Sequence, residues 1–130
     1  MGIEHSIDHA RRLVLVSVRG TLTDEEIFAY QRAVWSRPDV AGYDELVDMS
    51  DVEHIALPSA ERVRQLASLS SAMDTRTPGK LAIVAPKDFE FGLGRMYQAY
   101  REMESRSTKQ VRVFRSMELA LAWLGMRGGD

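Results

Sequence analysis

The 130-residue chain contains no cysteine, and this absence excludes disulfide bonds, thiolate metal sites and cysteine nucleophiles. The chain also has no apolar run near the roughly 20 residues that a membrane-spanning helix requires. Its amino terminus has neither a basic start nor an apolar stretch, so we expect no secretory signal peptide. These absences predict a cytoplasmic protein with no integral membrane segment.

A strong net charge is absent as well. The net charge of −2 argues against a dedicated nucleic-acid-binding protein. Charge is nevertheless unevenly spread, because residues 1–75 hold 7 basic and 13 acidic groups, whereas residues 76–115 hold 9 basic and 4 acidic groups. Such a polarised surface can orient a homodimer or attract an anionic partner, and the alternative is a solvated surface without a partner.

No low-complexity tract or internal repeat interrupts the chain, and its 45% hydrophobic and 28% charged residues are typical of a globular protein. A chain of this length forms one domain and buries about two thirds of its unfolded surface. We therefore expect a single domain over residues 1–125. A flexible C-terminal tail is expected at residues 126–130, where Gly128, Gly129 and Asp130 lie.

Short apolar runs bounded by turn residues predict five strands. They lie at residues 3–7, 13–18, 43–49, 81–85 and 111–114. The first two are so close that they must pair as an antiparallel hairpin. The later strands are separated by helices and therefore run parallel through right-handed crossovers.

Each of the expected helices has its own start signal. Thr23 and Glu26 form a capping box before the first helix, and Ser59 and Ser116 are caps for the second and the last helix. A further helix is expected over residues 90–104. The order is therefore β-β-α-β-α-β-α-β-α, an α/β fold with a mixed sheet of about five strands and about four helices.

Polar residues follow the third strand, where we expect it to end. Asp48, Ser50 and Asp51 come directly after its apolar residues, and Ser59 then begins the next helix. Open α/β sheets keep their functional residues at the carboxyl ends of strands, so we expect a partner- or ligand-binding loop here. The alternative is structural, because Asp and Ser side chains often accept hydrogen bonds from nearby amides of their own turn.

A second candidate segment opens the third helix. Gly92 and Gly94 permit close approach of an anion to backbone amides, and Arg95 is suited to bind a phosphate or carboxylate. The spacing matches neither a dinucleotide-binding loop nor a Walker loop, and the glycines alternatively let the helix pack tightly on the sheet. Phe89 and Phe91 are expected in the preceding loop, where one of them is exposed or covers a groove.

Several large side chains are candidates for the wall of an apolar pocket. Met96, Tyr97 and Tyr100 share one side of the third helix, and Trp123 lies in the last helix. Methionine and tyrosine fill irregular pockets. The alternative for residues at this helical spacing is an ordinary core.

The chain shows no catalytic constellation. His5, His9 and His54 do not converge with a serine partner or with one another, and they are interpreted as incidental. No Ser-His-Asp triad, pair of catalytic carboxylates, nucleotide loop or metal-ligand set can be assembled. We therefore expect no enzyme, no cofactor, no metal and no catalytic residue.

Three stretches carry a resemblance to a known family. They are Leu46–Val52 (LVDMSDV), Phe91–Tyr97 (FGLGRMY), and Val113–Ser116 (VFRS) followed by Ala120–Leu124 (ALAWL). With the strand and helix order, they make the chain similar to a STAS domain, the fold of the anti-sigma factor antagonists. The chain more closely resembles the bacterial SpoIIAA-like family, which is also described as SEC14-like.

The resemblance implies a regulatory serine, which this chain lacks at the matching position. In the antagonists, phosphorylation of a serine at the start of the helix, after an aspartate, prevents docking onto a kinase partner. Alignment on Asp48 and Val52 places that position at Pro58, with Ser59 one residue late and Ala56 in place of the aspartate. Ser59 is therefore interpreted first as a helix cap, and phosphorylation of Ser59 is the alternative.

The resemblance implies a non-enzymatic regulatory or binding domain. We predict protein contact through the segments 48–59 and 89–95, with a homodimer as the expected assembly and an unknown protein partner. The alternative, which the SEC14-like description implies, is a carrier or sensor of a small amphipathic or lipid-like ligand in an apolar pocket. In that case Arg95 would meet the polar head of the ligand.

Overall fold

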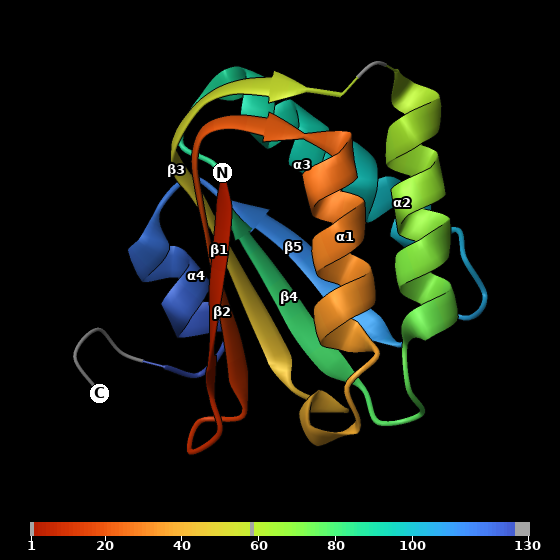
Figure 1. Ribbon diagram of the computed structural model, residues 1–130. Coiled ribbons are helices and arrows are strands. Elements are labelled where there is room, and N and C mark those ends of the chain that lie inside the picture. Colours follow the sequence, from red (N-terminus) through yellow and green to blue (C-terminus); the bar gives the residue numbers. More distant parts are fainter. Residues whose placement is uncertain (1, 58, 127–130) are drawn as a thin grey trace.

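The protein forms one five-stranded sheet between two layers of helices (Figure 1). The structure is a computed structural model that describes residues 2–57 and 59–126. The strands are β1 (Ile3–Asp8), β2 (Leu13–Thr23), β3 (Asp44–Ala56), β4 (Gly79–Val84) and β5 (Lys109–Phe114), and they lie side by side in the order of the sequence. β1 pairs with β2 antiparallel, and the other neighbouring strands pair in parallel. The predicted hairpin and mixed sheet are confirmed.

The helices lie on opposite sides of this sheet. They are α1 (Asp24–Trp35), α2 (Ala60–Met73), α3 (Asp88–Glu102) and α4 (Met117–Trp123), with a short 3₁₀ helix at Pro38–Val40. Because β2 to β5 follow one another in sequence and space, right-handed crossovers place α1, α2 and α3 on one face. α4 follows the last strand and packs on the other face (Figure 1).

The alternation of side chains along each strand matches these two layers. In β4, Leu81 and Ile83 point toward the layer of α1, α2 and α3, and Ala82 and Val84 point toward α4. In β3, Val47 points toward the three-helix layer. Two cores therefore share the same strands.

Strands β2 and β3 are longer than the sequence predicted. Asp48 is the last residue of β3 that pairs with β4, and beyond it β3 continues beside β2 as far as Ala56. We call residues 19–23 of β2 and 51–56 of β3 the outer ribbon. Register shifts near Gly20, whose φ is 61°, accompany a bend that carries this ribbon over the ends of α1 and α2 (Figure 1).

The predicted loop at residues 48–59 was therefore wrong up to Ala56. Asp48 and Asp51 lie in β3 and pair with Ser17 and Arg19 of β2. The pairing comes from a strand about 30 residues away, so the polar local sequence does not reveal it. Pro58, at the position of the family's serine, lies outside the described residues.

The predicted helix caps are confirmed. The Glu26 amide donates to Thr23 Oγ1 at 3.2 Å, and the Thr23 amide donates to Glu26 Oε2 at 3.1 Å. Ser59 and Ser116 accept from the amides of Arg62 and Leu119, at 3.3 and 3.2 Å. A Ser59 hydroxyl in this role stabilises α2 by about 1 kcal/mol.

α3 begins two residues earlier than predicted. Its first residue is Asp88, so Phe89 and Phe91 lie in the helix and not in a loop. Lys87 is the residue before the helix, and Asp88 and Glu90 place acidic groups in its first turn, where they interact favourably with the helix dipole.

The end of the chain is described only in part. The Met126 amide donates to the Leu121 carbonyl at 2.8 Å, and the Met126 side chain packs against the core beneath α4. Residues 127–130 of the predicted tail lie outside the described residues. Within the described part of the chain, no helix is both long and apolar enough to cross a membrane.

Candidate functional site

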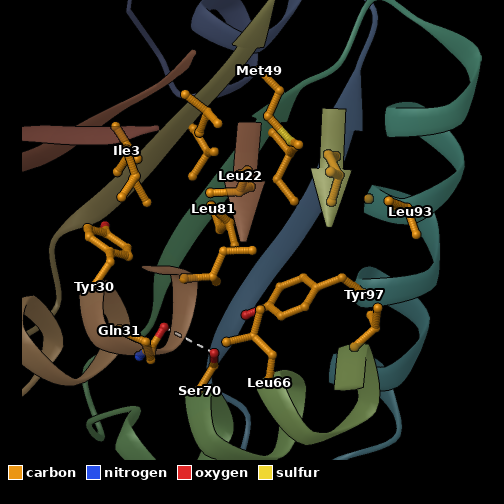
Figure 2. A pocket seen from close by; sticks show the side chains of 18 of the residues that line it. Ile3, Leu22, Tyr30, Gln31, Met49, Leu66, Ser70, Leu81, Leu93 and Tyr97 are labelled. Atoms are coloured by element: carbon orange, nitrogen blue, oxygen red, sulfur yellow. Dashed lines mark hydrogen bonds between the residues drawn. The ribbon is translucent and has the colours of Figure 1, made fainter. Parts of the chain in front are cut away.

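An apolar pocket of about 120 Å³ lies between the sheet and the three-helix layer (Figure 2). Its walls come from β1, β2, β3 and β4, with the outer ribbon included, and from α1, α2 and α3. Representative wall residues are Val47, Ile83, Ile27, Leu66, Leu93 and Leu22. The pocket is therefore walled by side chains of the main core and is partly open to solvent.

The pocket explains an unusual exposure pattern. Val47 and Met49 belong to a central strand and face the helix layer, yet both are only partly buried. Leu66 and Leu93, which face them from α2 and α3, are also only partly buried. Well-packed cores leave few voids larger than a water molecule. The side chains here do not fill the space that the backbone encloses.

One end of the pocket is polar. Gln31 of α1 and Ser70 of α2 are 8% and 1% exposed, and the Ser70 hydroxyl donates to Gln31 Oε1 at 3.0 Å (Figure 2). The amide nitrogen of Gln31 points to the sulfur of Met73, a weak acceptor, at 3.8 Å. This pair joins α1 to α2 and places two oxygens at the pocket wall.

A buried ion pair supports the pocket beside Tyr30. The Tyr30 hydroxyl donates to Glu45 Oε2 at 2.6 Å, and the Lys109 ammonium lies 3.2 Å from Glu45 Oε1. Burial and the nearby Glu45 carboxylate raise the pKa of Tyr30 well above its ordinary value. Burial lowers the pKa of Lys109, and the attraction of Glu45 opposes this shift. Tyr30 is therefore a neutral phenol at neutral pH.

A second buried ion pair supports Tyr97. The Arg101 guanidinium donates to Asp74 Oδ2 at 2.6 Å and to the Tyr97 hydroxyl at 2.8 Å. Asp74 also accepts from the Thr108 amide at 2.9 Å. Burial raises the pKa of Tyr97, although Arg101 opposes the shift, so the Tyr97 hydroxyl also keeps its proton at neutral pH. Figure 2 shows this hydroxyl turned toward the Gln31 and Ser70 end.

Asp48, the first residue of the predicted polar segment, lies on the other face of the sheet. Asp48 alternates with Val47 and lines a shallow groove with Ser6 and Ser17. Its Oδ1 accepts from the Ser50 amide at 3.0 Å and from the Ser50 hydroxyl at 2.6 Å. This is the local hydrogen bonding that the structural alternative predicted. Among the described residues, no three His, Asp or Glu side chains are placed to share a metal ion.

The second predicted segment meets the outer ribbon. The Lys87 ammonium donates to the Val52 carbonyl at 2.9 Å, so the start of α3 contacts β3. Phe89 is 63% exposed, as expected for one of the two phenylalanines, whereas Phe91 packs against the core and under the Arg115 guanidinium. Arg95 is exposed on α3 and is not among the pocket-lining residues described.

Of the four predicted pocket residues, Tyr97 lines the pocket. Met96, Tyr100 and Trp123 are not among its described lining residues. Trp123 lies on the α4 face and packs on Phe114, with 5.6 Å between the ring centroids. α4 follows β5 without a further strand, so no crossover rule placed it with α3.

The sequence interpretation missed Tyr30, Gln31, Glu45 and Ser70. A signal for two of them was present, because Gln31 and Ser70 are polar residues on the apolar faces of their helices. A polar residue on such a face is buried at a cost unless it finds a partner. Two of them on neighbouring helices therefore indicate a shared polar site.

Comparison with known proteins supports the fold. No protein-family model matches the chain, and no curated protein matches it. The chain is similar to a crystal structure of an uncharacterized protein from Shewanella loihica PV-4, described as a DUF3478-family protein with a SpoIIAA-like fold. The two share 18% identity over 95% of this chain and 93% of that chain, with a TM-score of 0.60. This chain therefore has a SpoIIAA-like fold.

Proposed function

We propose that the protein acts by binding a small, largely apolar molecule in the pocket, as a carrier or sensor and not as a catalyst. The observation that carries the proposal is an apolar pocket of about 120 Å³ in the main core, whose walls come from three helices and four strands. An apolar cavity of about 150 Å³ is large enough to bind benzene. The size therefore favours a single ring or a short chain over a long lipid.

The energetics of binding support a ligand of this size. Each buried methylene-sized group contributes about 0.8 kcal/mol, so a ring of about six carbon atoms gains several kcal/mol. Part of that gain offsets the lost translational and rotational freedom of the ligand. A simple ring is therefore expected to bind with an affinity between millimolar and micromolar.

The outer ribbon can couple such a ligand to the surface of the protein. Leu22 and Ile55 of the ribbon line the pocket, whereas Arg19, Thr21 and Glu53 of the same ribbon are exposed. A ligand that contacts the first set can stabilise one position of the second set. Through this coupling, ligand binding would affect the predicted protein contact at residues 48–59 and 89–95. That contact and the homodimer remain predictions.

The test is an NMR titration of the folded protein with benzene, with one pocket-filling variant and one matched control. Leu66→Trp fills the pocket from α2, and Leu119→Trp adds the same group at an exposed position of α4. We expect saturable chemical-shift changes at amides around the pocket in the natural protein and in Leu119→Trp. Leu66→Trp is expected to lose them.

Two results would count against the pocket as a binding site. One is the absence of saturable shifts in the folded natural protein up to the solubility limit of benzene. The other is binding of equal affinity in a folded Leu66→Trp variant, since the probe would then occupy some other place.

A further inference from the structure

We infer that the pocket selects an uncharged ligand with one hydroxyl or similar neutral hydrogen-bonding group, which binds at the Gln31, Ser70 and Tyr97 end. The inference rests on the proposed function, because it assigns chemistry to the ligand of the same pocket. It goes beyond that function in two ways. It excludes acids, including fatty acids, as ligands, and it names the residues that bind the polar group of the ligand.

The hydrogen-bonding groups at this end are complementary to a hydroxyl. The Ser70 proton is donated to Gln31 Oε1, which leaves a lone pair on Gln31 Oε1 and lone pairs on Ser70 Oγ as acceptors. The Tyr97 oxygen accepts from Arg101, so the Tyr97 proton is directed to Ser70 or to the ligand. Figure 2 shows the three side chains at the same end of the pocket. A group that both donates and accepts satisfies this set.

The charges around the pocket disfavour an acid. Among the described residues that line the pocket, Glu45 alone is charged, and it is a carboxylate. The two nearby cations already have partners, since Lys109 pairs with Glu45 and Arg101 pairs with Asp74. A bound carboxylate would lose its hydration without gaining a free cation, and such burial is costly. A neutral ligand avoids this cost.

The volume limits the rest of the ligand. The pocket of about 120 Å³ is close in size to the apolar cavity of about 150 Å³ that binds benzene. A phenol-sized ring or a short-chain alcohol fits that limit, with its apolar part against Leu66 and Ile83. The ligand class is therefore a small aromatic or aliphatic molecule with one neutral polar group.

The experiment compares ligands of matched shape by NMR titration of the full chain. Phenol and toluene differ by a hydroxyl in place of a methyl group, and benzamide and benzoate differ mainly in charge. We expect phenol to bind about threefold more tightly than toluene, because the gain of roughly one net hydrogen bond exceeds the loss of the buried methyl group. Benzoate is expected to bind at least about 100-fold more weakly than benzamide, because its charge is buried without a partner.

Matched variants locate the effect. Ser70→Ala removes the pocket hydroxyl, and Ser71→Ala removes a neighbouring buried hydroxyl that has no hydrogen-bond partner among the described residues and does not line the pocket. Ser70→Ala is expected to abolish the preference for phenol over toluene. Ser71→Ala is expected to keep it.

The outcomes separate the inference from the proposed function. Saturable binding of toluene with no preference for phenol, or with benzoate as tight as benzamide, overturns the inference and leaves the pocket as a binding site. Loss of the preference in Ser71→Ala as much as in Ser70→Ala also overturns it. Failure of all four probes to bind the folded natural protein contradicts the proposed function itself.

Discussion

The two faces of the sheet are built from the same strands but are filled differently. On the α4 face, Ala82 and Val84 are fully buried beneath one short helix, and a more open groove lies beside Leu46, Asp48 and Met117. On the other face, Val47 and Ile83 lie under three helices and still border an unfilled pocket. The number of helices over a face therefore does not determine how well that face is packed. The sizes of the side chains and the paths of the helices determine it.

The two faces also differ in how they satisfy polar groups. Asp48 on the α4 side stays partly exposed and is satisfied by Ser50, two residues away. Glu45 on the pocket side is 5% exposed and depends on Tyr30 and Lys109 from distant parts of the chain. Glu45 therefore depends on long-range polar contacts, whereas Asp48 is satisfied by a local one.

The largest expected effect comes from breaking a long-range ion pair on the pocket side. Asp74→Ala leaves the buried Arg101 charge without its carboxylate, since the two side chains are 6% and 3% exposed. We expect a loss of about 3–5 kcal/mol in the free energy of unfolding, measured by urea denaturation. Glu61→Ala breaks an exposed pair with Arg64 on α2 and is expected to leave that free energy nearly unchanged. Equal effects of the two substitutions would contradict the difference in burial.

A smaller change in stability is expected when a methylene group is added to either face of the sheet, and it tests whether the two faces are packed differently. Val84→Leu adds a methylene group to the filled α4 core, where it is expected to cost about 1–3 kcal/mol through overpacking. Val47→Leu adds the same group on the neighbouring strand, but into the pocket. We expect it to be neutral or to stabilise by up to about 0.8 kcal/mol. A Val47→Leu variant that loses as much stability as Val84→Leu would show that the pocket side is already full.

The smallest expected effect concerns the buried polar groups on the pocket side and depends on pH. The folded state holds the pKa of Tyr30 above its ordinary value of 10.0, so the folded protein keeps a proton that the unfolded chain releases. Stability from this group is intact below about pH 10 and falls as the pH rises toward the folded pKa, by up to about 1.4 kcal/mol per pH unit. Tyr30→Phe is expected to make the alkaline loss of stability less steep in urea titrations. An unchanged slope would mean that Tyr30 does not release its proton on unfolding in this range.

Local signals in the sequence were sufficient for most of the fold. Thr23, Ser59 and Ser116 each begin a helix because a side-chain oxygen satisfies a free amide within three residues. The short distance between β1 and β2 required a hairpin, and the intervening helices required parallel strands. All of these features depend on residues close together in the chain.

The errors arose where long-range contacts decide the structure. Residues 51–56 form a strand because β2 extends beside them, and the bend near Gly20 has no strong signal in the local pattern of β3. Trp123 resembled a pocket residue by its size, yet α4 packs on the opposite face. Gln31 and Ser70 were visible as polar residues on apolar helix faces. The hydrogen bond between these two side chains depends on how α1 packs against α2.

The most direct test of the pocket as a ligand site is a crystal structure of the natural protein soaked with phenol. We expect the ring to lie between Leu66 and Ile83, with its hydroxyl within hydrogen-bonding distance of Ser70 Oγ. A structure in which neighbouring side chains close the pocket, with phenol absent or bound only at the surface, would contradict a ligand-binding role for this site.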